Sequence, residues 1–225
     1  MTRAQHGASP EHPHDHPSAQ EPATEPASKE PSAGPPPQES EIRPHLKEPD
    51  SAGGPEGATV GRGARALVVT ASNRAASGVY ADTTGPLIVE RLRGLGFTVD
   101  GPRVVPDGRP VEEALRDGVA AGYDVVLTTG GTGISPTDAT PEATRRVIDH
   151  EVPGIAEAIR AYGRRKVATA SLSRGLAGVA GRTLIVNLPG STGGVKDGLA
   201  VLADLLPHAV DQLRGVDHPG SGGAL

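Results

Sequence analysis

Short apolar runs alternate with amphipathic stretches from about residue 64 to residue 214, and this alternation predicts strands and helices in turn. The run Ala66-Leu67-Val68-Val69 has the composition of a strand that is buried on both faces. Further strands are expected at residues 97–105, 124–129, 167–172 and 183–188. Because such strands need helices above and below them, the pattern predicts a single three-layer α/β/α domain with a mostly parallel central sheet.

Helices are expected between these strands, and proline, glycine and capping residues mark their ends. The first should be capped by Asp82 or Thr83 and end at Gly94–Gly96. Later helices should start at Pro110 and Thr140-Pro141, with Pro153-Gly154 dividing the second of these from the next, and both His150 and His208 on helices. The last helix should run from near Ser191 or Gly193 to about Arg214, with a kink at Pro207.

Composition divides the chain into three parts. The 62 residues before Gly63 hold 12 of the 22 prolines and carry a net charge of −5, which is the charge of the whole chain. This segment has too little apolar surface to offset the entropy of ordering it, so residues 1–62 are expected to be a disordered tail. Residues 63–215 form the predicted domain, and residues 216–225 are expected to be a flexible C-terminal tail.

The remaining part of the chain has no net charge, so it lacks the basic surface expected of a nucleic-acid-binding protein. None of its apolar runs reaches the roughly 20 residues that span a membrane, and the N-terminus lacks an apolar signal segment. The sequence contains no cysteine, which excludes disulfides, thiolate metal sites and a cysteine nucleophile. A cytoplasmic protein is therefore expected.

Candidate chemistry lies in four loops that follow predicted strands. They are residues 70–74, residues 106–109, the glycine-rich segment 129–138 and residues 187–194. In open α/β sheets, ligands bind beyond the carboxyl ends of the strands, so these loops are expected to form one site. The fourth loop opens the last helix and is a candidate anion cradle, with Lys196 one turn inside that helix.

The glycine-rich segment is the most informative of the four. Gly130, Gly131 and Gly133 allow backbone N–H groups to approach a ligand closely, and a helix start downstream favours an anion. Asp138 would repel a bare phosphate, so its presence is explained by a divalent cation that bridges it to a phosphate ligand. The segment is neither a Walker A motif nor a dinucleotide fingerprint. The glycines alone favour a tight strand-to-helix turn, and the acid with the Thr-Pro-Glu helix start makes the turn and the ligand site equally good interpretations.

Two other residues have alternative interpretations. Asp107, beside Gly108, is either a turn residue or a metal ligand. Arg174, in Ser173-Arg174-Gly175, is either part of an ordinary loop or a bidentate phosphate ligand.

The segment from Thr129 to Ala143, TGGTGISPTDATPEA, resembles the signature of the MogA/MoaB family of molybdopterin adenylyltransferases. Five further motifs follow the family's order, namely Gly78–Asp82 with Gly85-Pro86, Val105–Asp107, Val152–Gly154, Leu172–Gly175 and Asn187–Ser191. Together they cover about residues 65–214. The segment Ala75–Tyr80 is more similar to the Mog type than to the MoaB type.

The resemblance implies a magnesium-dependent enzyme that transfers AMP from ATP to the terminal phosphate of molybdopterin and releases pyrophosphate. It implies catalytic and metal-binding roles for Asp107 and Asp138. Molybdopterin or phosphate binding is assigned to Gly130, Gly131, Thr132, Gly133, Ser173 and Arg174, and nucleotide binding to Ser72, Asn73, Pro189, Gly190, Ser191 and Lys196. A homotrimer and a molybdate-inserting protein as partner are also implied.

Two features depart from the family's pattern. Asn73 stands where many relatives have an acid, so a third carboxylate contact is missing here, and the long N-terminal tail has no family counterpart. A non-catalytic molybdopterin-binding protein or a scaffold of the same fold is therefore the alternative.

Overall fold

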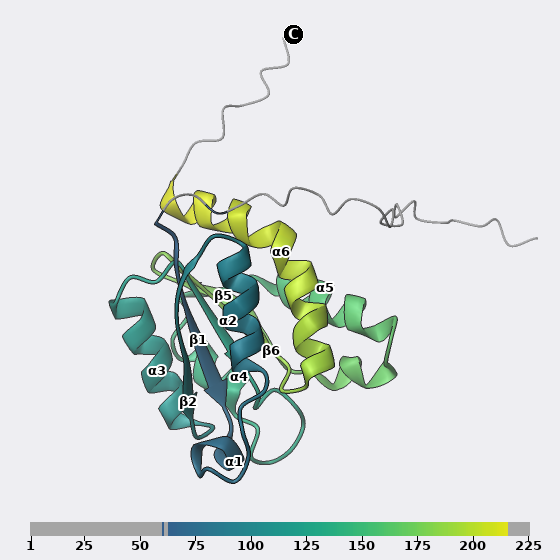
Figure 1. Cartoon of the computed structure of the whole chain (residues 1–225). Coiled ribbons are helices and arrows are strands. Elements are labelled where there is room, and N and C mark those ends of the chain that lie inside the picture. The colour runs from purple at the N-terminus through teal and green to yellow at the C-terminus, as the bar shows by residue number, and fades with distance from the viewer. Residues whose placement is uncertain (1–59, 61–62, 216–225) are drawn as a thin grey trace, which may run out of the picture. The chain divides into compact units, whose positions relative to one another are not determined.

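The computed structural model describes Val60 and residues 63–215 (Figure 1). The predicted C-terminal tail and, apart from Val60, the predicted N-terminal tail lie outside the described residues. Val60 itself is buried, and its backbone N–H donates to the carbonyl of Leu95 at 3.1 Å. The packed part of the chain therefore includes a residue that precedes the predicted boundary at Gly63.

Six strands form one mixed sheet in the order β2-β1-β3-β6-β5-β4. The four parallel strands are β1 (Arg65–Ala71), β2 (Thr98–Val105), β3 (Val125–Thr129) and β6 (Thr183–Leu188). The strands β5 (Ala177–Ala180) and β4 (His150–Glu151) pair antiparallel at one edge. The predicted α/β/α domain with a mostly parallel sheet is confirmed.

Helices cover both faces of the sheet, and each face has its own apolar core (Figure 1). On one face lie α2 (Gly85–Gly94), α5 (Pro153–Arg164) and α6 (Thr192–Arg214). On the other lie α3 (Arg109–Ala120) and α4 (Thr140–Arg145). The short helices α1 (Asn73–Ala76) and η1 (Ala168–Leu172) lie in loops.

Strand β1 explains why its sequence is apolar without alternation. Ala66 and Val68 pack into the core beneath α2 and α6, whereas Leu67 and Val69 pack into the core beneath α3. All four side chains are buried, as the central strand of a sheet covered on both faces requires.

The predicted strand at residues 167–172 is wrong. Residues 168–172 form the 3₁₀ helix η1, whose residues are mostly small, and Val167 and Leu172 are exposed instead of reaching a core. The strand next to β6 is instead β5, with the sequence AGVA, which the analysis missed. Alanine and glycine have low strand propensity, so pairing with β6 determines this strand. His150 lies in the two-residue strand β4 and not, as predicted, in a helix.

Helix α6 runs through Pro207, and Figure 1 shows its axis changing direction, in agreement with the predicted kink. Among the helices of the described residues, none is both long and apolar enough to cross a bilayer.

Asp124, just before β3, connects the two ends of the domain. Its two carboxylate oxygens accept hydrogen bonds from Arg214 Nε at 2.8 Å and Nη2 at 2.9 Å, and Oδ2 also accepts from the backbone N–H of Arg65 at 2.8 Å. Burial raises the pKa of Asp124, but the hydrogen bonds from Arg214 and Arg65 outweigh it, so the pKa is lowered.

We expect Asp124→Asn to lower the free energy of unfolding at pH 7 by about 1–3 kcal/mol, because a charged, partly buried hydrogen-bond acceptor is lost. A lowered folded-state pKa stabilises the fold above the pKa of the unfolded carboxyl group, about 3.9, and this stabilisation is lost as the pH falls through the folded-state value. Urea unfolding from pH 7 to pH 3 should show a wild-type advantage that is constant above about pH 5 and then shrinks. In Asp117→Asn, which removes an exposed ion pair with Arg103, the change should stay below about 1 kcal/mol.

Candidate active site

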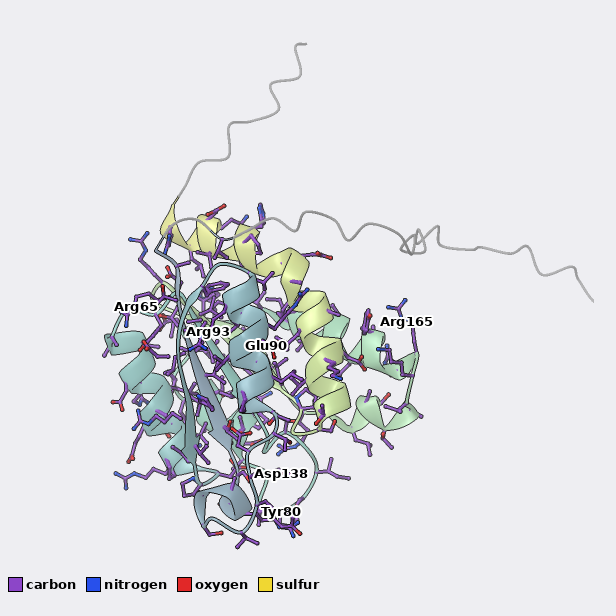
Figure 2. All side chains as sticks on the ribbon, in the orientation of Figure 1. Arg65, Tyr80, Glu90, Arg93, Asp138 and Arg165 are labelled. Atoms are coloured by element: carbon purple, nitrogen blue, oxygen red, sulfur yellow. The ribbon has the colours of Figure 1, made fainter. Side chains whose placement is uncertain are left out.

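The four predicted loops meet at the carboxyl ends of the parallel strands. Figure 2 shows Asp138 and Tyr80 together at this end of the domain, away from Arg65 at the start of β1. The segment after β1 is α1, whose first N–H groups are capped by Ser72, since its hydroxyl accepts from the N–H of Ala75 at 3.1 Å. The predicted polar loop is therefore a short capped helix.

Asn73 connects the first loop to the second. Its side-chain Oδ1 accepts from the backbone N–H of Asp107 at 3.1 Å. A neutral amide can thus position the loop that carries Asp107. The missing acid at residue 73 removes a charge from the site without removing this link.

Asp107 joins the loop after β2 to the start of α4. Its Oδ1 accepts from the N–H of Gly108 at 2.7 Å and from the hydroxyl of Thr140 at 3.1 Å, and its Oδ2 accepts from the N–H of Ala139 at 3.3 Å. Because Ala139 follows Asp138 in the chain, these bonds bring the two predicted catalytic acids to the same place.

The glycines of the third loop make room for other atoms of the protein. A Cβ on Gly130 would collide with the carbonyl oxygen of Ala71, and a Cβ on Gly131 with the carboxylate of Asp107. A Cβ on Gly133 would approach Asp138 Oδ2 to 2.7 Å. Gly130 and Gly131 also have positive φ values of 92° and 61°. The glycine pattern therefore allows two carboxylates to lie against the backbone.

Asp138 lies in a turn within this loop. Its N–H donates to the carbonyl of Ser135 at 3.0 Å, and its Oδ2 accepts from the N–H of Ser135 at 3.0 Å. The side chain is partly exposed, and it lines the two cavities described next.

Two cavities meet at this end of the sheet. The first, of about 330 Å³, is lined by Ser72, Asn73, Arg74, Tyr80, Asp82, Asp107 and Gly130, among others. The second, of about 760 Å³, is lined by Thr132, Gly133, Ile159, Arg160, Lys166, Leu172, Ser173, Pro189, Ser191, Lys196 and Asp197, among others. Gly131, Asp138 and Gly190 line both cavities and form what we call the shared wall.

The predicted nucleotide-binding residues do not lie together. Ser72 and Asn73 line the first cavity, whereas Pro189, Ser191 and Lys196 line the second. Ser191 also caps α6, because its hydroxyl accepts from the N–H of Gly194 at 3.1 Å. The fourth loop is therefore a helix N-terminus that opens into the larger cavity.

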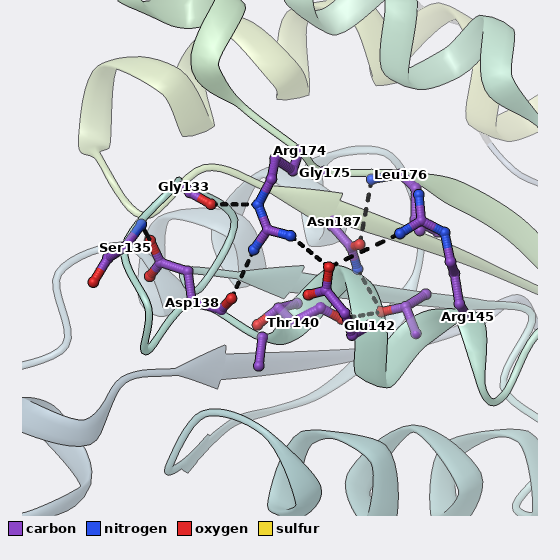
Figure 3. A network of polar contacts seen from close by, with 12 residues as sticks. Gly133, Ser135, Asp138, Thr140, Glu142, Arg145, Arg174, Gly175, Leu176 and Asn187 are labelled. Atoms are coloured by element: carbon purple, nitrogen blue, oxygen red, sulfur yellow. Dashed lines mark hydrogen bonds and ion pairs between the residues drawn. The ribbon is translucent and has the colours of Figure 1, made fainter.

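Arg174 lines neither of these two cavities. Its guanidinium donates to the carbonyls of Gly133 and Asp138, at 2.6 Å each, and forms an ion pair with Glu142 (Figure 3). Burial raises the pKa of Glu142, but the hydrogen bond from Arg174, a backbone hydrogen bond and the charges of Arg174 and Arg145 together outweigh burial, so the pKa is lowered and the pair stays charged.

Sequence analysis assigned no ligand-binding role to Asp82, Lys166 or Asp197, which also line the cavities. Asp82 accepts from the hydroxyl of Thr70 at 2.7 Å and from the N–H groups of Thr84 and Gly85 at the start of α2. The N-cap residue of α2 is Thr84, and not Asp82 or Thr83 as predicted. Lys166 forms an ion pair with the nearly buried Asp197, and this hydrogen bond raises the pKa of Lys166. The partners are 31 residues apart, so no local pattern could reveal them.

Asp107 and Asp138 fit a magnesium site in which phosphate oxygens of a substrate supply the remaining ligands. Among the described residues, His, Asp and Glu side chains form no cluster of three that could hold a metal on its own. Mg²⁺ is commonly held by one or two carboxylates together with water and substrate phosphates, and Asp107 and Asp138 supply two carboxylates to one cavity.

Comparison with known proteins agrees with this architecture. The model of the family described as "Probable molybdopterin binding domain" matches residues 67–208, which is more than half of the chain. The chain belongs to the MogA/MoaB family. The motifs that sequence analysis assigned to the MogA/MoaB pattern, from Gly78 to Ser191, all fall within the matched range.

Individual members of the MogA/MoaB family differ in length. A molybdenum cofactor biosynthesis bifunctional protein of Synechococcus elongatus is 39% identical over 157 residues, 69% of this chain and 49% of its own. The chain thus spans about half the length of that relative. A molybdopterin adenylyltransferase of Helicobacter pylori strain J99 is 37% identical over 155 residues, 66% of this chain and 86% of its own.

A solved structure agrees with the resemblance to the Mog type. The molybdopterin biosynthesis Mog protein from Mycobacterium ulcerans is 58% identical, covers 67% of this chain and 99% of its own, and superposes with a TM-score of 0.65.

Gly131→Ala should destabilise the protein more than Gly181→Ala. Both glycines have a positive φ, 61° and 57°, but a Cβ on Gly181 would have nothing within 4 Å, whereas one on Gly131 would displace Asp107. The φ effect alone should be about 1 kcal/mol, and the displaced carboxylate should add about 1–3 kcal/mol in Gly131→Ala. Equal losses in urea unfolding would contradict the close packing of Asp107 on Gly131.

Proposed function

We propose that the protein is a molybdopterin adenylyltransferase, which transfers AMP from ATP to the terminal phosphate of molybdopterin and releases pyrophosphate. The observation that carries the proposal is the shared wall, where two cavities meet beside a carboxylate. A reaction between two bound substrates needs two sites with one common boundary, because the reacting atoms must lie about 3–3.5 Å apart.

The larger cavity suits molybdopterin. Apolar parts of Ile159, Val167 and Leu172 offer surface to a flat heterocycle. The N-terminus of α6, with Ser191, lies in the same cavity and suits the terminal phosphate. Ser173, which the family resemblance associates with molybdopterin, lines this cavity too.

The smaller cavity suits ATP. It holds Asp107, Ser72 and Asn73, and at its edge the guanidinium of Arg74 stacks on the ring of Tyr80, 4.1 Å from the centroid. An exposed aromatic ring offers a stacking surface to a nucleobase. Of the six residues predicted to bind nucleotide, we now assign Pro189, Ser191 and Lys196 to the molybdopterin side.

The reaction joins two anions. An oxygen of the molybdopterin phosphate attacks the α-phosphorus of ATP, the bond from that phosphorus to the bridging oxygen breaks, and pyrophosphate leaves with the electron pair. No proton has to be abstracted from an ionised phosphate, so the task of the site is alignment and charge neutralisation. Asp107 and Asp138 would hold Mg²⁺, which when bound neutralises phosphate charge.

The names of relatives support this proposal, since the Helicobacter pylori protein is called a molybdopterin adenylyltransferase and the chain spans 86% of it. From the family resemblance we also propose a homotrimer and a molybdate-inserting protein as partner, and from the composition a cytoplasmic location. The alternative is a protein that binds molybdopterin without turnover, and the following experiment distinguishes it from an adenylyltransferase.

Purified protein supplied with molybdopterin, ATP and Mg²⁺ should form AMP-molybdopterin and pyrophosphate. Asp138→Asn should lower kcat about 100-fold or more, because several kcal/mol of charge stabilisation depend on the bound cation. Chelation should abolish the reaction and added Mg²⁺ should restore it. Asp117→Asn, on the exposed face of α3, should leave the rate unchanged. Tight molybdopterin binding without pyrophosphate release in the wild type would favour the non-catalytic alternative.

A crossed pair of variants tests which substrate takes which cavity. Tyr80 lines the first cavity and Leu172 the second, and both side chains are more than half exposed, so a charge at either is compatible with folding. We expect Tyr80→Asp to raise KM for ATP about tenfold and Leu172→Asp to raise KM for molybdopterin about tenfold, a cost of about 1.4 kcal/mol each for repelling an anionic substrate. The reverse pattern would exchange the two assignments.

A further inference from the structure

Arg174 is well suited to binding phosphate, yet its guanidinium is turned to the protein's own backbone. We propose that Arg174 is a positioning residue that fixes Asp138 at the shared wall, in place of the phosphate-binding role that its sequence motif predicts. The proposal rests on the adenylyltransferase function, and it concerns how the loop that carries Asp138 is held.

The guanidinium spans the two ends of this loop. Nε donates to the carbonyl of Gly133 and Nη2 to the carbonyl of Asp138, and the backbone N–H of Arg174 donates to the carbonyl of Thr132 at 2.8 Å. One rigid, planar group thus fixes the spacing of residues 133 and 138 (Figure 3). Because Arg174 bonds directly to the backbone carbonyl of Asp138, only the side-chain torsions of Asp138 separate its carboxylate from this fixed point.

The loop needs such an external support. Between residues 133 and 138 the hydrogen bonds of Ser135 with Asp138 and with Thr137 join the loop to itself. Ile134, the one large apolar side chain of this segment, is 68% exposed and packs into no core. Apolar burial therefore contributes little to the position of Asp138.

Glu142 neutralises the charge of Arg174. The two side chains form an ion pair, and the other oxygen of Glu142 is buried without a hydrogen-bond partner among the described residues. Arg145 Nη1 lies 4.0 Å from the same carboxylate, and Arg145 Nε donates to Glu151 at 2.9 Å. Among the described residues, Arg145 makes no hydrogen bond to residues 133–138. Arg145 is therefore a matched arginine that shares the ion pair and lacks the loop contacts.

Arg174 also connects the two cavities. On one side, its chain neighbour Ser173 lines the larger cavity, where the carbonyl of Ser173 lies 3.5 Å from Arg160 Nη1. On the other side, Arg174 bonds to Asp138, which lines both cavities. The same residue thus joins a wall of the proposed molybdopterin cavity to the carboxylate proposed to hold the cation.

The test compares Arg174→Lys with Arg145→Lys. Lysine keeps the positive charge, but a single ammonium group cannot reproduce the planar fork that bonds two carbonyls and a carboxylate together. We expect Arg174→Lys to lower kcat about 10- to 100-fold and to raise the Mg²⁺ concentration needed for half-maximal rate, with KM for molybdopterin unchanged. Arg145→Lys should leave all three values within twofold of the wild type.

Amide hydrogen exchange of the free protein gives a readout that does not depend on the reaction. Residues 133–138 should exchange faster in Arg174→Lys and at the wild-type rate in Arg145→Lys, with equal global stability in the two variants. Should the wild type fail to transfer AMP, the proposed function fails, while faster exchange of this loop would still support the positioning role.

Two results would overturn the proposal. One is an Arg174→Lys protein with unchanged kcat and unchanged exchange in residues 133–138. The other is a rise in KM for molybdopterin with normal kcat, which is the signature of direct phosphate binding.

If Arg174→Lys does not fold, Glu142→Gln replaces it, because this change keeps the side-chain shape and removes the charge that orients Arg174. It should lower kcat less than tenfold and accelerate exchange of the same loop, and wild-type behaviour in both would again refute the role.

Discussion

The site depends on close contact between two carboxylates, Asp107 and Asp138, and the backbone of two glycines, Gly131 and Gly133. Asp107 occupies the space that a Cβ on Gly131 would take, and Asp138 approaches the space beside Gly133. Carboxylates repel one another and prefer water, so holding two of them in one cavity requires compensating donors. For Asp107 these are the N–H groups of Gly108 and Ala139 and the hydroxyl of Thr140. The glycines make the arrangement sterically possible, and the donors make it energetically acceptable.

This polar contact rests on a rigid apolar base. Strands β1 and β3 are buried on both faces, so the points where their loops leave the sheet are fixed by two cores. The loops themselves bury little apolar surface and are held by hydrogen bonds, among which those of Arg174 and Asn73 join residues far apart in the sequence. Stability and site geometry therefore depend on different sets of residues. A substitution in the loops can change the position of a carboxylate and leave the fold intact.

Sequence patterns could predict the parallel strands, because runs such as residues 66–69 are apolar on both faces, and they could predict the loops that carry the site. They could not predict β5, since AGVA has no strand preference of its own and depends on pairing with β6. They also could not separate the two cavities, because Ser191 and Ser72 follow different strands and only the folded sheet places them in different cavities. The role of Arg174 was hidden for a similar reason, as its partner Glu142 lies 32 residues away.

Charge balance around the shared wall supports the proposal that a divalent cation takes part in the reaction. Two protein cations of this region are already paired, Arg174 with Glu142 and Lys166 with Asp197. Their positive charge is thus largely cancelled before an anionic substrate arrives, whereas Asp107 and Asp138 line the same cavity as acids. In the first cavity Asp82, Asp107 and Asp138 face a single cation, Arg74, so phosphate groups that enter it meet net negative charge from the protein. Only an added cation can reverse the sign there, and the carboxylates that would repel the substrates are the groups that would bind it.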